Sequence, residues 1–555
     1  MVDATKPLRG CAFLVENEIP DQCFTPEDVT AEQRQMRQAV ADYVVKEVMP
    51  KIDRLEKQDF PLMVSILKQA GALGFLGLEV PEAYGGMGLS MIDSALVFEG
   101  FGAGGSASLL VTIGAHGGIG TVPLLFFGND EQRGRYLAKL ATAELIGAYA
   151  LTEPESGSDA LAAKTKAELT PDGKHYKVNG KKRFITNAGF ADLFTVLAKV
   201  DGQNACLLIE RATPGVSIGK EEHKMGLKGS STCEVMFDDA LVPVENLLGQ
   251  VGSGQKVIFN TLNYGRFKLG AGAAGALKAG IAQVLAYATA RKQFGKSLTE
   301  FDAIRAKFAD MVVAAWVGES MVYRTAGLLA KNLHGVPFGN AAAKAIHEYT
   351  AECAMVKVVL SEMVDNVVDD AVQIYGGYGY IEDYPAARAY RDARVQRIFE
   401  GTNEINRMLV LSEFAKRQIK GEVDFLGPYQ NLERVPAFDA RNPQTALPVL
   451  KTATLAILGF ASEKLMMRLE DEQQILLKLA DMLMAVFAAE SALLRLEKMR
   501  QTGNADAALA EAVVKVCLRQ AAMVVRDGLE SVMAFAEEEK WDASRTLNDL
   551  AEEAL

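Results

Sequence analysis

Apolar residues at helical spacing dominate the first part of the chain. Thr30 and Gln33 stand three residues apart, as in a capping box, and an apolar face at helical spacing follows them. Residues 106–127 are rich in small and apolar side chains and read as buried helix with a break near Pro123. This pattern predicts an N-terminal helical domain over residues 1–147.

The pattern changes after residue 147. Short runs typical of strands cover residues 194–200, 205–209 and 233–237, with Gly and Asp between them. Asn179-Gly180 predicts a two-residue hairpin turn. We therefore expect a small β domain over residues 148–254, between two helical blocks.

Helical patterns return at residue 255 and continue to 420. Four prolines, at positions 428, 436, 443 and 448, then indicate a linker. Leucines near helical spacing, among them Leu469, Leu476 and Leu483, and the amphipathic stretch 512–535 predict more helices beyond it. The expected fold class is mainly α with a central β domain, divided into residues 1–147, 148–254, 255–420 and a linker with a helical extension over 421–555.

Composition and charge narrow the function classes. The chain has 555 residues, of which 49% are hydrophobic and 23% charged, and its net charge is −12. Such an acidic chain is not expected to bind nucleic acid, which usually requires a basic surface. Six scattered cysteines without a CxxC pair and five dispersed histidines suggest neither disulfides nor a metal site. Reduced thiols in a cytoplasm are the simplest interpretation.

Two features bear on membranes. The start of the chain shows no targeting pattern. The uncharged run Gly100–Asn129 is long enough to cross a bilayer, but its many glycines and polar residues favour a buried core segment. We expect a soluble or peripherally membrane-associated protein.

Two glycine-rich runs, Gly100–Gly105 and Gly270–Gly275, match the dinucleotide-binding fingerprint by spacing alone. That fingerprint needs a preceding strand, and both runs stand in helical surroundings. We interpret them as sites of close helix packing. Gly295-Lys296-Ser297 ends like a phosphate-binding loop, but Ala290 stands where that loop requires glycine.

The most informative residue is Glu400, in the run Ile398-Phe399-Glu400-Gly401-Thr402. A carboxylate between apolar neighbours has a raised pKa and is a candidate general base. Gly401 allows a ligand to approach the backbone closely. The alternative is an ordinary glutamate on an exposed helix face.

Four further segments are as particular as the one around Glu400. They are Tyr149–Asp159, Arg183–Gly189, Arg291–Lys296 and Gln373–Tyr380. Taken singly, the first three have plain alternatives: a polar turn, a strand with a core phenylalanine, and a surface arginine beside a buried phenylalanine.

In this order and spacing, the five segments resemble the acyl-CoA dehydrogenase flavoproteins. The likeness runs from about Thr25 to Lys416, and the long tail makes the chain most similar to the very-long-chain subgroup. The resemblance implies an N-terminal α domain, a middle β domain and a C-terminal four-helix bundle, with an extra helical domain. It also implies FAD, oxidation of an acyl-CoA thioester to trans-2-enoyl-CoA, and an electron-transferring flavoprotein as acceptor.

The resemblance carries roles onto individual positions. Glu400 is the expected catalytic base, and Phe399, Gly401, Asn263, Arg266 and Ser158 are expected to contact the acyl-CoA substrate. The residues expected to bind FAD are Tyr149, Thr152, Ser158, Phe184, Thr186, Arg291, Gln293, Phe294, Gln373, Gly376, Gly377, Thr402 and Glu404. Relatives often have tryptophan at the place of Phe184.

Among these residues, Arg291, Gln293, Phe294, Gln373, Gly376 and Gly377 are expected to reach the FAD of a second subunit. The resemblance thus implies a homo-oligomer, most simply a dimer. The base position favours straight acyl chains, and the tail favours long ones. The tail is expected to pack as a helical bundle on the main body or at the dimer interface, in preference to lying on a membrane surface.

Three other functions are open at this point. An acyl-CoA oxidase would use oxygen with the same fold and base. A non-catalytic assembly or scaffold relative would not need Glu400 and the flavin contacts. Nitroalkane-oxidising relatives typically use aspartate as base, which Glu400 disfavours.

Overall fold

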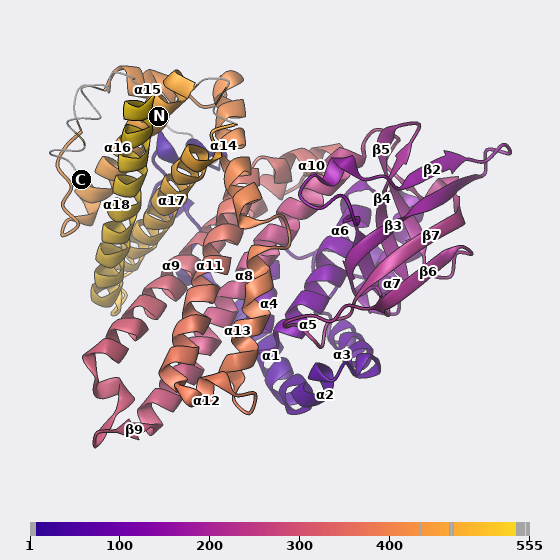
Figure 1. The fold of residues 1–555 in the computed structure, drawn as a ribbon, viewed down its shortest axis with the longest axis horizontal. Coiled ribbons are helices and arrows are strands. Elements are labelled where there is room, and N and C mark those ends of the chain that lie inside the picture. Colours follow the sequence, from indigo (N-terminus) through magenta and orange to yellow (C-terminus); the bar gives the residue numbers. More distant parts are fainter. Residues whose placement is uncertain (1–6, 433–434, 466–467, 469–470, 540–549, 551–555) are drawn as a thin grey trace.

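The computed structural model describes residues 7–432, 435–465, 468, 471–539 and 550. Figure 1 shows the strands at one end, long helices in the centre and the C-terminal helices at the other end. The predicted fold class, mainly α with a central β domain and extra C-terminal helices, is confirmed. Leu469 of the predicted apolar stripe lies outside the described residues.

The N-terminal block is helical, as predicted. Thr30 caps α1, and its side chain and that of Gln33 form the expected capping box. The 106–127 segment is broken at the π-helical turn η7 (Gly114–Gly120), while Pro123 stands in the first turn of the next helix. The helices are α1 (Ala31–Tyr43), α2 (Ile52–Glu56), α3 (Phe60–Ala72), α4 (Met91–Ala103), α5 (Ala107–Ile113), α6 (Val122–Phe127) and α7 (Asp130–Ala141).

The middle of the chain forms one sheet with the strand order β6-β7-β3-β2-β4-β5-β8, and β1 pairs with β4. The predicted hairpin turn at Asn179-Gly180 is wrong. The strand β3 passes through these residues with a register shift between Val178 and Gly180, which is the signature of a β-bulge. The strands are β1 (Gly147–Ala150), β2 (Lys166–Leu169), β3 (His175–Thr186), β4 (Leu193–Val200), β5 (Gln203–Glu210), β6 (Val216–Glu221), β7 (Thr232–Pro243) and β8 (Leu247–Leu248).

The central helices are α8 (Gly254–Ala290), α9 (Asp302–Leu333), α10 (Asn340–His347), α11 (Thr350–Tyr375), α12 (Gly377–Tyr380), α13 (Pro385–Ala393) and α14 (Asn403–Ile419). A small hairpin of β9 (Lys292–Gln293) and β10 (Lys296–Ser297) follows α8. The two glycine-rich runs pack against each other, as expected. A Cβ at Gly102 would lie 2.0 Å from the carbonyl oxygen of Gly272, and one at Gly275 would lie 1.9 Å from that of Glu99. The α4 and α8 backbones therefore touch.

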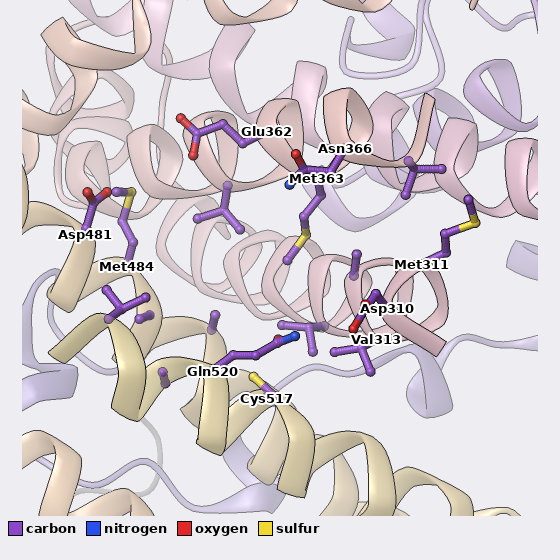
Figure 2. A pocket seen from close by; sticks show the side chains of 18 of the residues that line it. Asp310, Met311, Val313, Glu362, Met363, Asn366, Asp481, Met484, Cys517 and Gln520 are labelled. Atoms are coloured by element: carbon purple, nitrogen blue, oxygen red, sulfur yellow. The ribbon is translucent and has the colours of Figure 1, made fainter. Parts of the chain in front are cut away.

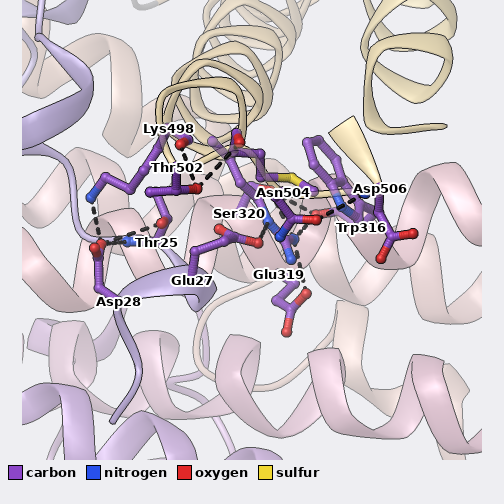
Figure 3. A network of polar contacts seen from close by, with 12 residues as sticks. Thr25, Glu27, Asp28, Trp316, Glu319, Ser320, Lys498, Thr502, Asn504 and Asp506 are labelled. Carbon is purple, nitrogen blue, oxygen red and sulfur yellow. Dashed lines mark hydrogen bonds and ion pairs between the residues drawn. The ribbon is translucent and has the colours of Figure 1, made fainter. Parts of the chain in front are cut away.

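The extension comprises α15 (Leu426–Gln430), α16 (Pro443–Leu465), α17 (Gln473–Gln501) and α18 (Ala507–Glu538). Buried polar contacts join it to the main body and to the segment before α1. Arg324 of α9 pairs with Glu18 and Glu490, at 2.8 Å in each case. Lys498 pairs with Asp28, as Figure 3 shows. Among the described residues, three stretches are long and apolar enough to cross a membrane: Ala107–Phe127, Gly254–Ala290 and Pro443–Leu465. Within an apolar 18-residue window of each stretch, 78%, 44% and 78% of the window, respectively, is buried inside the protein.

Candidate active site

Glu400 lies in a strained turn between the short helix η11 (Arg394–Arg397) and α14. Its φ is +57°, and that of Gly401 is +80°. The left-handed region costs a non-glycine residue roughly 1–2 kcal/mol, so the surroundings must hold the turn. Nε of Arg266 donates to the carbonyl oxygen of Glu400 at 3.0 Å. Such over-determined strain is typical of functional sites.

The Glu400 carboxyl group turns inward. The residue as a whole is half-buried, but Oε2 has no solvent contact and no hydrogen-bond partner in the described part of the chain. A Cβ on Gly265 would lie 2.9 Å from Oε2, so glycine there leaves room for the carboxyl group. Burial raises the pKa of Glu400 to about 7, while the positive charges of Arg266 and Lys357 oppose that rise. A pKa near neutrality suits a general base.

The carboxyl group faces a narrow, mostly apolar pocket of about 90 Å3. Its wall includes Phe98 from α4, Leu110 and Val111 from α5, Gly114 and Ile119 from η7, Thr186 from β3, and Gly265, Lys268, Leu269 and Ala273 from α8. A second groove of about 320 Å3 shares Ala107, Leu110, Asp392 and Gln396 with this pocket. The two cavities thus adjoin along α5 and α13.

Residues predicted to face the flavin ring lie around the edge of the β domain. Tyr149 on β1 is buried, and its hydroxyl group has no partner within the described residues. The N–H of Arg183 donates to the carbonyl oxygen of Thr152 at 2.8 Å, which joins the two predicted segments. Phe184 is 56% exposed at a φ of +57°. Ser158 is exposed in the loop after β1.

The residues predicted to serve a second subunit gather at the far end of the central helices. Arg291, Gln293 and Phe294 follow α8, and Gln373, Gly376 and Gly377 close α11. All of them are exposed, and Phe294 is 94% exposed. Tyr287 and Tyr375 stack at 3.9 Å between ring centroids and hold the two helix ends together. These residues do not line the Glu400 pocket.

The remaining predicted residues have different surroundings. Thr402 caps α14 by accepting the N–H of Ile405, Glu404 is exposed, and Phe399 lines the pocket. Asn263 and Arg266 are buried and bonded to each other at 3.0 Å. Arg266 therefore supports the turn of the base from inside the protein, and its predicted contact with coenzyme A stays a prediction.

Sequence reasoning missed two lysines at the site, Lys268 and Lys357. Lys268 lines the pocket and pairs with Glu79 at 2.9 Å. Lys357 of α11 donates to the carbonyl oxygen of Gly401 at 2.8 Å. No local signal marks them, because a single lysine within a helix usually lies on its solvated face.

A larger cavity of about 760 Å3 lies between α9, α11, α17 and α18. Figure 2 shows Glu362, Asp481, Met484 and Cys517 around it. Valine and alanine side chains share its wall with acidic and methionine side chains, and it does not include Glu400. This cavity is therefore not the candidate active site, although it is larger than the pocket at Glu400.

Models of known protein families match most of the chain. Models of the acyl-CoA dehydrogenase N-terminal, middle and C-terminal domains match residues 30–144, 148–240 and 252–414. Another acyl-CoA dehydrogenase C-terminal domain model matches residues 449–547. The extension is thus itself a recognised part of such proteins.

Individual relatives extend the match. A probable acyl-CoA dehydrogenase of Bacillus subtilis (strain 168) is 45% identical over 488 residues, which cover 85% of this chain and 82% of that protein. The mitochondrial very long-chain specific acyl-CoA dehydrogenase of Homo sapiens is 40% identical over 348 residues, 61% of this chain and 51% of that protein. A crystal structure of an acyl-CoA dehydrogenase complexed with FAD from Bacillus anthracis aligns with a TM-score of 0.92 and 41% identity, covering 99% of this chain and 96% of that one.

The chain belongs to the acyl-CoA dehydrogenase family. The predicted family and enzyme class are confirmed, and the FAD in the solved relative confirms the predicted flavin cofactor at the level of the family.

Proposed function

We propose that this protein oxidises acyl-CoA thioesters between the α and β carbons to trans-2-enoyl-CoA, with Glu400 as the base that takes the α proton. The observation that carries the proposal is the inward carboxyl group of Glu400. It faces an apolar pocket, and burial raises its pKa to about 7. A thioester α-hydrogen is a weak acid, so its removal needs such a placed base.

The residues around the pocket fit FAD. The buried, unpartnered Tyr149 hydroxyl group and the Thr186 side chain supply polar contacts beside Glu400, and the exposed Phe184 ring offers a face for a flat ring system. When bound, FAD supplies the hydride acceptor. The roles of Thr152, Ser158, Thr402 and Glu404 at the flavin are part of the same proposal.

The backbone of the turn at Glu400 also provides a hydrogen-bond donor for the thioester oxygen of the substrate. Within the part of the chain that the structure describes, the Glu400 N–H donates no hydrogen bond. A free backbone N–H next to the base can stabilise the negative charge that develops on the oxygen as the proton leaves.

Long, straight acyl chains are the proposed substrates. The pocket of about 90 Å3 holds only a few carbon atoms, and the adjoining groove of about 320 Å3 provides further apolar space. Gly114 and Ala115 are small residues in the α5–η7 side of the wall, beside the larger Leu110, Val111 and Ile119. The very long-chain specific relative supports the same preference.

Partners and location complete the proposal. The exposed cluster around Phe294 is proposed to complete the FAD site of a second subunit in a homodimer, and an electron-transferring flavoprotein is the proposed acceptor. A cytoplasmic location and the domain division at 147/148, 254/255 and 420/421 stay predictions. An apolar 18-residue window of Pro443–Leu465 is 78% buried inside the protein, which supports packing of the extension on the body over contact with a membrane.

Glu400→Gln tests the function. This variant keeps the size of the side chain and removes its basicity, so it should bind FAD and stay yellow while acyl-CoA no longer bleaches the flavin under anaerobic conditions. Glu530→Gln, on the exposed face of α18, is the matched control and should behave as wild type. Full flavin reduction in Glu400→Gln would remove Glu400 from the reaction.

A further inference from the structure

Lys357 contacts the turn that carries Glu400 through the backbone of the next residue, Gly401. It stands on α11 and is fully buried. Its Nζ donates to the carbonyl oxygen of Gly401 at 2.8 Å and to Oδ1 of Asn403 at 2.7 Å. The ammonium group therefore contacts the residue after the base and the first residue of α14.

We propose that Lys357 is a positioning residue for Glu400: it holds the strained turn that carries the base and places a buried positive charge behind it. The inference rests on the proposed function of Glu400.

The turn depends on side chains from other helices. Glu400 and Gly401 both have left-handed backbone conformations, and the helix α14 begins only at Asn403. Arg266 bonds the carbonyl oxygen of Glu400, while Lys357 and Asn406 bond that of Gly401. Without Lys357, one charged contact that opposes the strain is lost, and charge-assisted hydrogen bonds are the stronger kind.

Lys357 is itself anchored through a chain of polar contacts. Its partner Asn403 donates from Nδ2 to Oε1 of Glu362 at 2.9 Å. Arg407 donates hydrogen bonds to both carboxyl oxygens of Glu362, at 2.7 and 3.0 Å. It also pairs with Asp481 of α17 at 2.7 Å. Figure 2 shows Glu362 and Asp481 at the wall of the large cavity. Through this chain the extension supports the position of the lysine.

The positive charge of Lys357 also lowers the pKa of Glu400. A positive charge favours the ionised carboxylate, which is the form that accepts a proton. Burial lowers the pKa of Lys357 to about 7, and the nearby carboxylates oppose this. Two oxygen acceptors at its Nζ also favour the charged ammonium. Other ionisable groups around the pair are Arg266 and Lys268 from α8, Tyr149 from β1, Glu362 from α11, Asp392 from α13 and Glu404 from α14.

Two variants distinguish the hydrogen bond that Lys357 donates to the turn from the effect of its positive charge. Lys357→Met removes both the donor and the charge, whereas Lys357→Gln removes the charge and keeps an N–H donor on a side chain that is one bond shorter. The measurement is the rate of anaerobic flavin reduction by a long-chain acyl-CoA as a function of pH, with the flavin content of each variant determined beforehand.

Lys357→Met should reduce the flavin at least tenfold more slowly at pH 7, and the midpoint of its pH profile should move about one unit higher, because one pKa unit is a tenfold change in the ionised fraction. Lys357→Gln should show the same upward shift with a smaller loss of rate at high pH. Lys451→Met, which breaks a buried pair with Glu490 in the extension, should lose thermal stability without a shift of the midpoint.

A wild-type rate and midpoint in Lys357→Gln overturns the inference even if Lys357→Met does not fold. The proposed function fails separately, because it stands or falls on the loss of flavin reduction in Glu400→Gln.

Discussion

Nζ of Lys268 lies 2.9 Å from Oε1 of Glu79 inside the wall of the Glu400 pocket. Lys268 is almost fully buried, and its Nζ lies 4.7 Å from the ring centroid of Phe98 and 4.6 Å from that of Tyr264. Tyr264 also donates a hydrogen bond to Glu79. An otherwise apolar pocket thus contains a paired charge whose methylene groups help to form the wall.

We expect the length and the charge of Lys268 to have separable effects. Lys268→Met keeps the length of the side chain but leaves Glu79 without its cation, so it should cost roughly 3–5 kcal/mol of stability with little change in the preferred acyl length. Lys268→Ala should in addition open the wall and move the preference to longer or bulkier chains. Thermal denaturation and flavin bleaching by a series of acyl-CoA lengths measure the two effects. Equal acyl preferences in both variants would show that Lys268 does not shape the pocket.

The pH dependence of flavin reduction should report the base. Glu400 must be ionised to accept a proton, and burial raises its pKa to about 7. The rate of flavin reduction should therefore rise with pH through about 7 and fall by about tenfold per unit on the acid side. Rapid anaerobic mixing at constant flavin content measures this. A rate that does not change between pH 5.5 and 8.5 would exclude this ionisation from the reduction step.

The contact between α4 and α8 should tolerate no added methyl group. In Gly275→Ala the new Cβ would lie 1.9 Å from the carbonyl oxygen of Glu99, so the helices must separate, at a cost of about 1–3 kcal/mol or more. Gly280→Ala, one and a half turns further along α8, meets nothing within 4 Å. This control should be neutral or slightly stabilising because alanine favours helix. The melting temperatures of the two variants should move in opposite directions, or at least differ by about 1–3 °C.

The extension should depend on its buried ion pairs. Arg324→Met leaves Glu18 and Glu490 buried without their cation, which should cost roughly 3–5 kcal/mol and make the extension more sensitive to limited proteolysis. Arg526→Met removes an exposed pair with Glu530 and should change neither property measurably. Equal protease resistance of both variants would mean that hydrophobic packing alone holds the extension.

Local patterns were sufficient for much of the molecule. The capping box at Thr30 and the packing of the two glycine-rich runs follow from residue types and spacing, and the structure bears out both. The error at Asn179-Gly180 has a physical reason. Asn-Gly favours a tight turn, but β3 keeps its pairing with β7 on both sides of the bulge, so tertiary pairing outweighs the local preference. The observed hairpin turn lies between β2 and β3, at Pro171-Asp172-Gly173, which carries equally strong turn residues.

The surroundings of the base could not be predicted in the same way. Glu400 itself stands out by its apolar neighbours and the glycine after it. Lys357 and Arg266 stand 43 and 134 residues away from Glu400 in sequence, and nothing in their own helices shows that they point at it. Partners so distant come together only through the packing of α8 and α11, which a local pattern does not encode.

The touching backbones of α4 and α8 have a consequence for how substrate preference can change. Phe98 lies on α4, and Gly265, Leu269 and Ala273 lie on α8. Because the two helices touch, the width of the pocket between these residues is fixed. Evolution or engineering can lengthen or shorten the space for the substrate by exchanging individual side chains, but it cannot widen it by sliding the helices apart. A homologue that accepts strongly branched acyl groups should therefore carry smaller residues at the positions of Phe98, Leu269 or Ala273 rather than a different helix spacing.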